Sequence, residues 1–390
     1  MPWKTMEVMD QKIRLIVDWG TKKFSKADLS CKYEISRPTI DKWLARYGQE
    51  GIDGLKERSR APHNCSHKTS DKIIEMIVVQ KLKNAKRGPK KIIAQLKREH
   101  PNMQWPSPST AGEWLKKHNL VKKRKKRHRV APYSEPFRMC TKPNEVWSAD
   151  YKGQFSTQDG KLCYPLTISD NYSRYLLKCH GLQGPRYYQT KAVFESAFKE
   201  YGLPNAIRTD NGIPFASVSI GGLSHLSIWW ILLGIIPERI DKGCPEQNGR
   251  HERMHRTLKE EALNPVAQTL REQQMEFKRF RVAYNDKRPH EALNQEYPCD
   301  YYKTSKRAYS HRLKKPEYDS SVEIRQVRRN GHIMFSNQDF FLSKLLGGYA
   351  IGLKEVDDGY WQIYFSFQPI GTIDIRKKRI INELYEAGKV

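Results

Sequence analysis

A run of positive charge divides this 390-residue chain into two parts with different sequence patterns. Residues 116 to 129, KKHNLVKKRKKRHR, contain nine Lys or Arg residues and no acidic residue. Like charges this dense repel one another and offer no apolar face to bury, so the run cannot fold on itself. We therefore expect all-α domains before it, a basic linker over 121–141, and domains that contain strands after it.

Before the linker, helical periodicity appears in two successive blocks. Residues 25–48 read as a helix, a tight turn and a second helix that begins near Ser36 and Pro38, which predicts a helix-turn-helix. Residues 70–120 hold three further helical segments, with a start signal at Gly88-Pro89 and another near Ser107 or Ser109. We assign 1–60 to one helix-turn-helix domain and 69–120 to a second, in which a wing could be present. A plain three-helix packing unit is the alternative interpretation.

The second helix of the first block has one face suited to a DNA major groove. Ile40, Trp43 and Leu44 recur at the spacing of a buried helical face. The polar residues left on the outside are the candidates for DNA contact: Arg37, Thr39, Lys42 and Arg46.

After the linker, the pattern changes to alternating strands and helices. Three strands in meander order, followed by helices and strands in turn, predict a mixed sheet with helices on both faces over residues 142–300. Residues 319–385 contain only strand patterns, with hairpin signals at Asn330-Gly331 and Asp358-Gly359, and we expect a small β-barrel there. This barrel could bind DNA or simply pack on the core.

The charge balance points to a nucleic-acid partner. Lys and Arg number 70 against 43 Asp and Glu, a net charge of +27, and such a field attracts a polyanion. The longest apolar run, residues 228–236, is far shorter than the ~20 residues that cross a membrane. Seven cysteines without a C-x-x-C pair favour a reducing, intracellular compartment. Within the linker, the expected phosphate contacts are Lys122, Lys123, Arg124, Lys125, Lys126 and Arg127; a merely solvated segment is the alternative.

Two aspartates stand out in this basic chain. Asp150 lies in the first expected strand of the mixed sheet, and Asp210 ends a short buried strand directly before Asn211-Gly212. Carboxylates gathered at strand ends repel one another unless a cation neutralises them, which implies a divalent metal. Oxygen ligands favour Mg²⁺ or Mn²⁺. An ordinary surface carboxylate is the alternative for each residue taken alone.

Three motifs in order, WSAD (147–150), TDNG (209–212) and PEQNGRHERMHRTLK (245–259), resemble the DDE-type integrase core of bacterial insertion-sequence transposases and retroviral integrases. The segment YNDKRPHEAL (284–293) is typical of the bacterial branch. The resemblance implies a ribonuclease H-like fold for the core, and it implies Asp150 and Asp210 as the first two catalytic acids. It also implies two Mg²⁺ ions, for which Mn²⁺ can substitute.

The third acid is either Glu246 or Glu252. Spacing favours Glu246, since 246 − 210 − 1 = 35 intervening residues, as in many members of the superfamily, whereas Glu252 gives 252 − 210 − 1 = 41. The family pattern P-x-x-N-G/A-x-x-E favours Glu252, and we choose it as catalytic and metal-binding residue. Asn248 would cap a helix that starts at Gly249 and carries Glu252 in its first turns. The family's basic residue then falls on Lys259, and the DNA contacts expected from this segment are Asn248, Arg250 and Lys259.

The resemblance implies a DNA transposase that binds terminal inverted repeats, cuts the DNA ends and joins them to target DNA. Double-stranded DNA and further copies of the chain, in a dimer or larger assembly, are the implied partners, and no membrane is involved. The implied location is the bacterial cytoplasm, on the nucleoid. A DNA-binding regulator with an inactive core and a metal-dependent ribonuclease are the competing hypotheses.

Overall fold

The computed structural model describes every residue except 1–6, 59–68, 122–139, 242–246, 248 and 383–390. Its residues form two compact units, 1–68 and 69–390. The expected linker positions 122 to 127, together with Glu246 and Asn248, lie outside the described residues. Among the described helices, none combines the length and the apolar character that crossing a bilayer demands.

The first unit is a three-helix fold in which α1 (Val8–Gly20), α2 (Lys26–Tyr33) and α3 (Arg37–Glu50) are followed by the 3₁₀ turn η1 (Gly51–Leu55). Ile40 and Trp43 of α3 are buried as expected, and they pack with residues of α1, α2 and η1. The Ser36 hydroxyl does not cap the backbone of α3 and instead lies 2.8 Å from the Thr39 hydroxyl. A capping box forms one helix earlier, at Ser25 of α2.

The second unit opens with another three-helix group: α4 (Asp71–Lys83), α5 (Pro89–Glu99) and α6 (Pro108–Lys117). The start signals are confirmed, because Gly88 is the N-cap of α5 and the Ser107 hydroxyl caps α6 by accepting from the Thr110 amide. Between residues 69 and 121 the structure describes no strand. Arg98 of α5 pairs with Asp300 of the following domain, with two nitrogen to oxygen distances of 2.5 and 3.0 Å.

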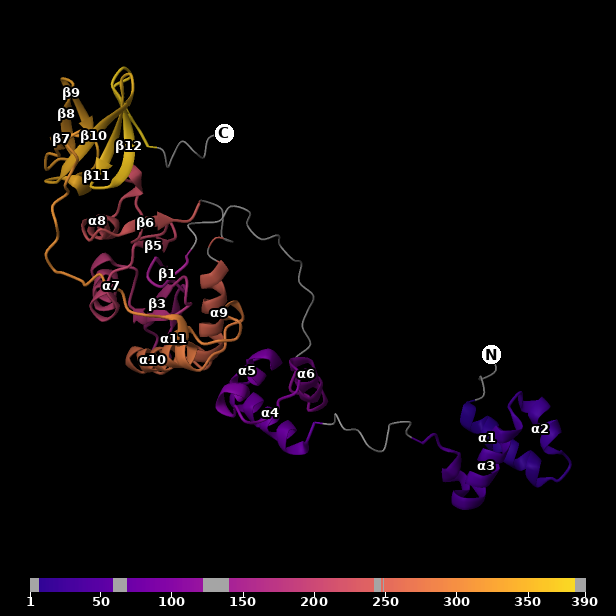
Figure 1. The fold of residues 1–390 in the computed structure, drawn as a ribbon. Helices are drawn as coiled ribbons and strands as arrows, with labels where there is room; N and C mark the ends of the chain where they lie inside the picture. The colour runs from indigo at the N-terminus through magenta and orange to yellow at the C-terminus, as the bar shows by residue number, and fades with distance from the viewer. Residues whose placement is uncertain (1–6, 59–68, 122–139, 242–246, 248, 383–390) are drawn as a thin grey trace. The chain divides into compact units, whose positions relative to one another are not determined.

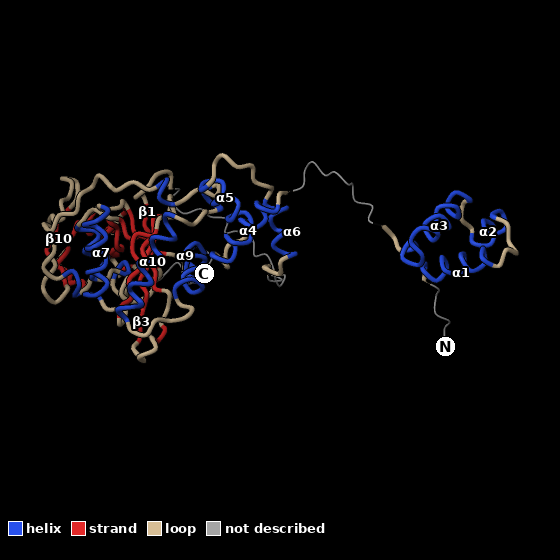
Figure 2. The backbone as a smooth tube through the Cα atoms, turned by 90° about the horizontal axis from the view of Figure 1, so that it is seen from below, coloured by secondary structure: helices blue, strands red, loops and turns tan. Residues whose placement is uncertain are grey.

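The core is a mixed sheet with helices on both faces, as the sequence pattern predicts (Figures 1 and 2). Across the sheet the strands run β4, β3, β1, β5, β6, and the short β2 pairs with the start of β3. β4, β3 and β1 pair antiparallel, whereas β1, β5 and β6 pair parallel. The strands are β1 (Val146–Tyr151), β2 (Phe155–Ser156), β3 (Leu162–Asp170), β4 (Leu176–Leu182), β5 (Ala206–Thr209) and β6 (Ile236–Arg239).

Two hydrophobic clusters show which helices cover each face of the sheet. Trp147 of β1 and Ile207 of β5 pack in the same cluster as Phe198 and Trp229, so helices α7 and α8 cover this face. Met254 and Phe277 belong to the cluster of the other face, which α9 and α10 cover. The bounds are α7 (Tyr187–Tyr201), α8 (His225–Leu232), α9 (Gly249–Ala262), α10 (Leu270–Asp286) and α11 (Pro298–Tyr301), with 3₁₀ turns η2 (Ile220–Gly222) and η4 (Glu291–Leu293).

The C-terminal region, 323–381, is a five-stranded antiparallel sheet with a separate two-stranded hairpin. The sheet order is β13, β12, β11, β10, β7, and within the described residues the strand pairing does not close into the expected barrel. Ile228 and Ile231 of α8 share a hydrophobic cluster with this sheet, which therefore packs on the core. The strands are β7 (Glu323–Gln326), β8 (His332–Phe335), β9 (Gln338–Phe341), β10 (Ala350–Asp357), β11 (Tyr360–Phe365), β12 (Gln368–Asp374) and β13 (Arg379–Ile381), with the turn η5 (Lys344–Leu346).

One of the two predicted hairpins is wrong. Asp358-Gly359 joins the antiparallel pair β10 and β11, which confirms that turn. Asn330-Gly331 turns the chain, but β7 before it pairs with β10 and β8 after it pairs with β9. The turn forms as predicted, but β8 pairs with β9, while β7 is the edge strand of the five-stranded sheet.

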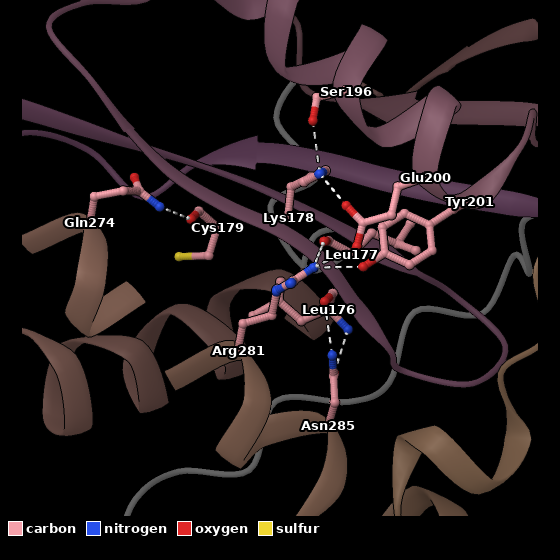
Figure 3. A network of polar contacts seen from close by, with 10 residues as sticks. All are labelled: Leu176, Leu177, Lys178, Cys179, Ser196, Glu200, Tyr201, Gln274, Arg281 and Asn285. Atoms are coloured by element: carbon pink, nitrogen blue, oxygen red, sulfur yellow. Dashed lines mark hydrogen bonds and ion pairs between the residues drawn. The ribbon is translucent and has the colours of Figure 1, made fainter. Parts of the chain in front are cut away.

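Side chains of α10 form hydrogen bonds with backbone groups of β4, the strand at the edge of the sheet (Figure 3). The Asn285 amide accepts from the Leu176 N–H at 2.8 Å and donates to the Leu176 carbonyl at 3.0 Å. The Gln274 amide likewise accepts from the Gly181 N–H and donates to the Cys179 carbonyl. Edge strands expose unpaired backbone groups to other chains, and these two amides occupy such groups on β4.

We expect Asn285→Ala to lower the free energy of unfolding by about 2 kcal/mol, because it leaves two buried backbone groups of Leu176 without partners. Urea denaturation measures this loss. The matched control is Asp286→Ala, whose side chain is exposed on the next residue and which should change stability by less than about 0.5 kcal/mol. An equal loss in both variants would contradict the role of the Asn285 amide.

The motif YNDKRPHEAL also contains a histidine that stays neutral in the folded protein. The His290 ring packs on Tyr284 at 4.7 Å between ring centroids. Burial, followed by the nearby Lys91 and Arg288, lowers the pKa of His290 to about 3. Because the unfolded chain binds a proton near pH 6.5 and the folded protein does not, stability is lost as the pH falls below 6.5.

Between pH 7.5 and 5.5 this single site should remove about 1 kcal/mol of stability. His290→Gln should flatten the pH dependence of the urea midpoint by that amount. A slope that is the same in His290→Gln and in the unsubstituted protein would show that His290 does not titrate on unfolding.

Candidate active site

The two candidate aspartates lie at equivalent positions on neighbouring parallel strands. Val146 pairs with Ala206 and Ser148 with Arg208, a constant offset of 60 residues (206 − 146). Continued by two residues, this register sets Asp150 opposite Asp210, which directly follows the last residue of β5. Adjacent strands are ~4.8 Å apart, so the register brings the two residues close together.

The alternation of side chains directs both aspartates to the same face. Trp147 and Ala149 of β1 and Ile207 of β5 are in the cluster under α7 and α8. Residues one position away point to the opposite face of a strand, so Asp150 faces α9, and Asp210 does so if the strand geometry continues.

Asp210 occupies a half-buried position directly after β5. Burial raises the pKa of Asp210, and its hydrogen bond from the Gly212 N–H acts in the opposite direction. A Cβ atom at Gly212 would lie 3.1 Å from an Asp210 carboxylate oxygen, so glycine gives this carboxylate room. A carboxylate with a raised pKa gains most from a nearby cation, which restores the charged form.

Helix α9 brings the third motif over this face. It begins at Gly249, as predicted, and Glu252 lies in its first turn with an exposed side chain. Lys259 follows two turns later, also exposed. Burial lowers the pKa of Lys152, just after β1, and the charge of Lys259 lowers it further while Asp150 acts in the opposite direction. Lys259 is therefore within electrostatic range of the end of β1.

A histidine of α9 that the motifs did not single out lies near Asp150. The His255 Nδ1 lies 3.9 Å from the Asp150 carboxylate, and its Nε2 lies 2.8 Å from the Thr167 hydroxyl on β3. Burial, followed by His251 and Lys152, lowers the pKa of His255 to about 2, so the ring is neutral and this contact is no ion pair. The sequence signal that could have identified His255 is its helical spacing, because it follows Glu252 by three residues and so lies on the same face of the helix.

The described residues fit a divalent ion in part. Asp150 and Asp210 supply oxygen ligands on neighbouring strands, which is the donor chemistry that Mg²⁺ and Mn²⁺ prefer. Within the described part of the chain, no three His, Cys, Asp or Glu side chains are gathered closely enough to hold one metal ion. Glu252 thus lies on α9, the helix that contacts Asp150, but it does not complete a three-residue metal site. Glu246 lies outside the described residues.

The other candidate DNA contacts are on separate elements. Arg37 and Lys42 are exposed on α3, whereas Thr39 and Arg46 are partly buried, and Arg46 lies over the Trp43 ring at 5.1 Å. Arg250 is the second residue of α9.

Comparison with known families identifies four of the regions. Residues 140–242 and 233–298 match integrase core domains, and together these matches contain Asp150, Asp210 and both candidate glutamates. Residues 322–381 match the C-terminal domain of IS481 family transposases. Residues 11–63 match a helix-turn-helix domain and residues 39–115 a homeodomain-like domain.

Relatives come from insertion elements. A protein of insertion element IS407 from Burkholderia multivorans is 30% identical over 185 residues, which cover 46% of this chain and 63% of that protein. A protein of IS476 from Xanthomonas euvesicatoria is 27% identical, over 46% of this chain and 51% of its own length. The chain thus spans between half and two thirds of these relatives.

Among solved structures, a chain of the simian T-cell lymphotropic virus intasome in complex with the PP2A regulatory subunit B56 gamma is 15% identical, with a TM-score of 0.38 over 75% of this chain and 97% of that one. The domain matches and the insertion-element relatives support the resemblance: residues 140–298 are similar to integrase core domains, and residues 322–381 are similar to the C-terminal domain of IS481 family transposases.

Proposed function

We propose that this chain is a DNA transposase that binds the terminal inverted repeats of its element, cleaves the DNA ends and joins their 3′-hydroxyl groups to target DNA. The observation that supports the proposal is the parallel register of β1 and β5, whose continuation by two residues would set Asp150 opposite Asp210. An integrase core and a transposase C-terminal domain in one chain support the same reaction.

In this proposal Asp150, Asp210 and Glu252 hold two Mg²⁺ ions, or Mn²⁺ in their place. The metal ions supply activation of the attacking oxygen and stabilisation of the leaving 3′-oxygen in an in-line phosphoryl transfer. Glu252 would move toward the aspartates when DNA binds, because the described residues do not gather three metal-binding side chains without DNA. Lys259 holds a phosphate group beside the two aspartates, and no side chain of the protein becomes bonded to DNA.

The remaining parts would recognise and hold the DNA. Residues 1–60 and 69–120 are proposed as two DNA-reading domains and 121–141 as a phosphate-binding linker, with 142–300 as the catalytic core and 319–385 as the C-terminal domain. Two DNA ends must react together, so we propose a dimer or larger assembly on DNA, acting in the bacterial cytoplasm on the nucleoid.

A second candidate is a DNA-binding regulator with an inactive core. The observation that favours it is that the described residues do not gather three metal-binding side chains. We place it second because Asp150, Asp210, Glu252 and Lys259 are all present.

Removal of metal separates the two functions. Full-length protein mixed with duplex DNA that carries an end of its element should nick the DNA in Mg²⁺, lose all nicking in EDTA, and recover it in excess Mg²⁺ or Mn²⁺. Binding of the same duplex, measured by fluorescence anisotropy, provides the control. Binding without nicking under every metal condition would establish the regulator, and cleavage only of an RNA–DNA hybrid would establish a ribonuclease.

A further inference from the structure

His255 is a buried titratable group 3.9 Å from the Asp150 carboxylate, and the proposed function does not use it. Its side chain is 9% exposed and that of Asp150 13%. The ring lies between β3 and β1, with Nε2 toward Thr167 and Nδ1 toward the Asp150 carboxylate. Its hydrogen bonds determine which nitrogen carries the proton.

Thr167 determines the tautomer of this ring. The Thr167 hydroxyl lies 3.0 Å from the backbone carbonyl oxygen of Asp150, which has no hydrogen, so the hydroxyl donates its one proton there. The same hydroxyl oxygen can then only accept from His255, 2.8 Å away, and the ring must carry its hydrogen on Nε2. In the neutral ring the lone pair is therefore on Nδ1, which faces Asp150.

The separation of Nδ1 and the carboxylate oxygen is close to that of two ligands of one cation. Around an octahedral ion with bonds of ~2.1 Å, neighbouring ligand atoms are ~3.0 Å apart and opposite ligand atoms ~4.2 Å apart. The distance from His255 Nδ1 to Asp150 Oδ2 is 3.9 Å, which is too long for a direct hydrogen bond, and a shift of less than ~1 Å brings the two atoms to the spacing of neighbouring ligands. A cation between the two atoms would use both electron pairs.

We propose that His255 Nδ1 binds a metal ion that Asp150 holds, so that this position of the active site has a nitrogen ligand besides its carboxylate oxygens. The proposal rests on the proposed function in one respect, namely that Asp150 is a metal ligand. Thr167 plays the part of the outer group that receives the second ring N–H of a metal-binding histidine and fixes the ring orientation. Water and phosphate oxygens complete the shell.

A nitrogen ligand changes the metal preference of the site. Imidazole suits transition metals, whereas Mg²⁺ takes oxygen ligands almost exclusively. We expect the full-length protein to bind Mn²⁺ more tightly than Mg²⁺, and His255→Asn to weaken Mn²⁺ binding about 10-fold or more while the Mg²⁺ affinity changes by less than about threefold.

Electron spin-echo envelope modulation of Mn²⁺ bound to the full-length protein tests the proposal directly. The unsubstituted protein should show ¹⁴N modulation from a coordinated imidazole, and His255→Asn should lose it. His251→Asn is the matched control, because this second buried histidine lies one turn earlier on α9, with ring centroids 5.3 Å apart. It should keep the signal, and circular dichroism verifies the fold of each variant.

Asp150→Asn distinguishes failure of this inference from failure of the proposed function. If Mn²⁺ binds in a manner that needs Asp150 but shows no ¹⁴N modulation, or if His255→Asn retains the modulation, His255 is not a ligand and the transposase function stands. If no Mn²⁺ binding depends on Asp150, both proposals fall. Thr167→Val, a substitution of similar shape without the hydroxyl, should lower Mn²⁺ affinity about 10-fold, and an unchanged affinity would overturn the assigned role of Thr167.

Discussion

Replacing Asp150 by Asn is expected to reduce Mg²⁺-dependent nicking by on the order of 10³-fold, equivalent to ~4 kcal/mol in the activation free energy. The amide has almost the same volume as the carboxylate, so the packing around this buried side chain is retained. What is lost is the negative charge at the end of β1 that holds a cation beside Asp210. The measurement is the initial rate of nicking of end-bearing duplex DNA at saturating Mg²⁺.

DNA binding should survive this substitution, because the proposed DNA-reading surfaces are in other domains. Anisotropy titrations with the same duplex should give a dissociation constant within about threefold of the unsubstituted protein. Asp286→Asn, an exposed aspartate on α10, is the control for loss of a negative charge and should nick normally. Nicking by Asp150→Asn at the normal rate would remove Asp150 from the active site.

Glu252→Gln is expected to reduce nicking by about 10²-fold or more, whereas Glu246→Gln should retain activity within about threefold. Glu252 lies in the first turn of α9, three residues before His255, whose ring reaches Asp150. Residues three apart share a helix face, so a small shift of α9 brings the Glu252 carboxylate to the aspartates.

The nicking rates of the two variants identify the third catalytic acid. Both remove one negative charge from the same short segment, so a general effect of charge on DNA binding cancels between them. If Glu246→Gln abolishes nicking and Glu252→Gln does not, the third acid is Glu246, and the aspartate pair and the fold remain. Equal activity of both variants would mean that neither glutamate is needed.

Sequence patterns predicted those parts of the protein whose structure depends on near neighbours. The starts of α5 and α6 follow from Gly88-Pro89 and Ser107, because a helix terminus depends on residues within one turn. The Asp358-Gly359 hairpin is correct for the same reason, since its two strands are adjacent in the chain. The three motifs likewise pointed to the integrase core, because each motif is a short stretch that can be read without knowing the fold.

The sequence patterns gave wrong or incomplete predictions where a structure depends on residues that are far apart in the chain. The Asn330-Gly331 signal predicted a hairpin, but β7 pairs with β10 and β8 pairs with β9. A barrel was expected from the run of strands, although closure depends on how the first and last strands meet, which no local pattern encodes. His255 was missed because its significance comes from Thr167, 88 residues earlier in the chain.

By itself, the sequence determined the starts of α5, α6 and α9 and the chemical types at the candidate site, since these depend on short-range propensity, charge and spacing. Only the tertiary structure decided that β1 and β5 pair in parallel, that α10 covers the edge of β4, and that the His255 Nδ1 lies 3.9 Å from the Asp150 carboxylate. The physical reason is that strand register and helix docking are chosen by the burial of whole faces, a property of many residues together that no single motif contains.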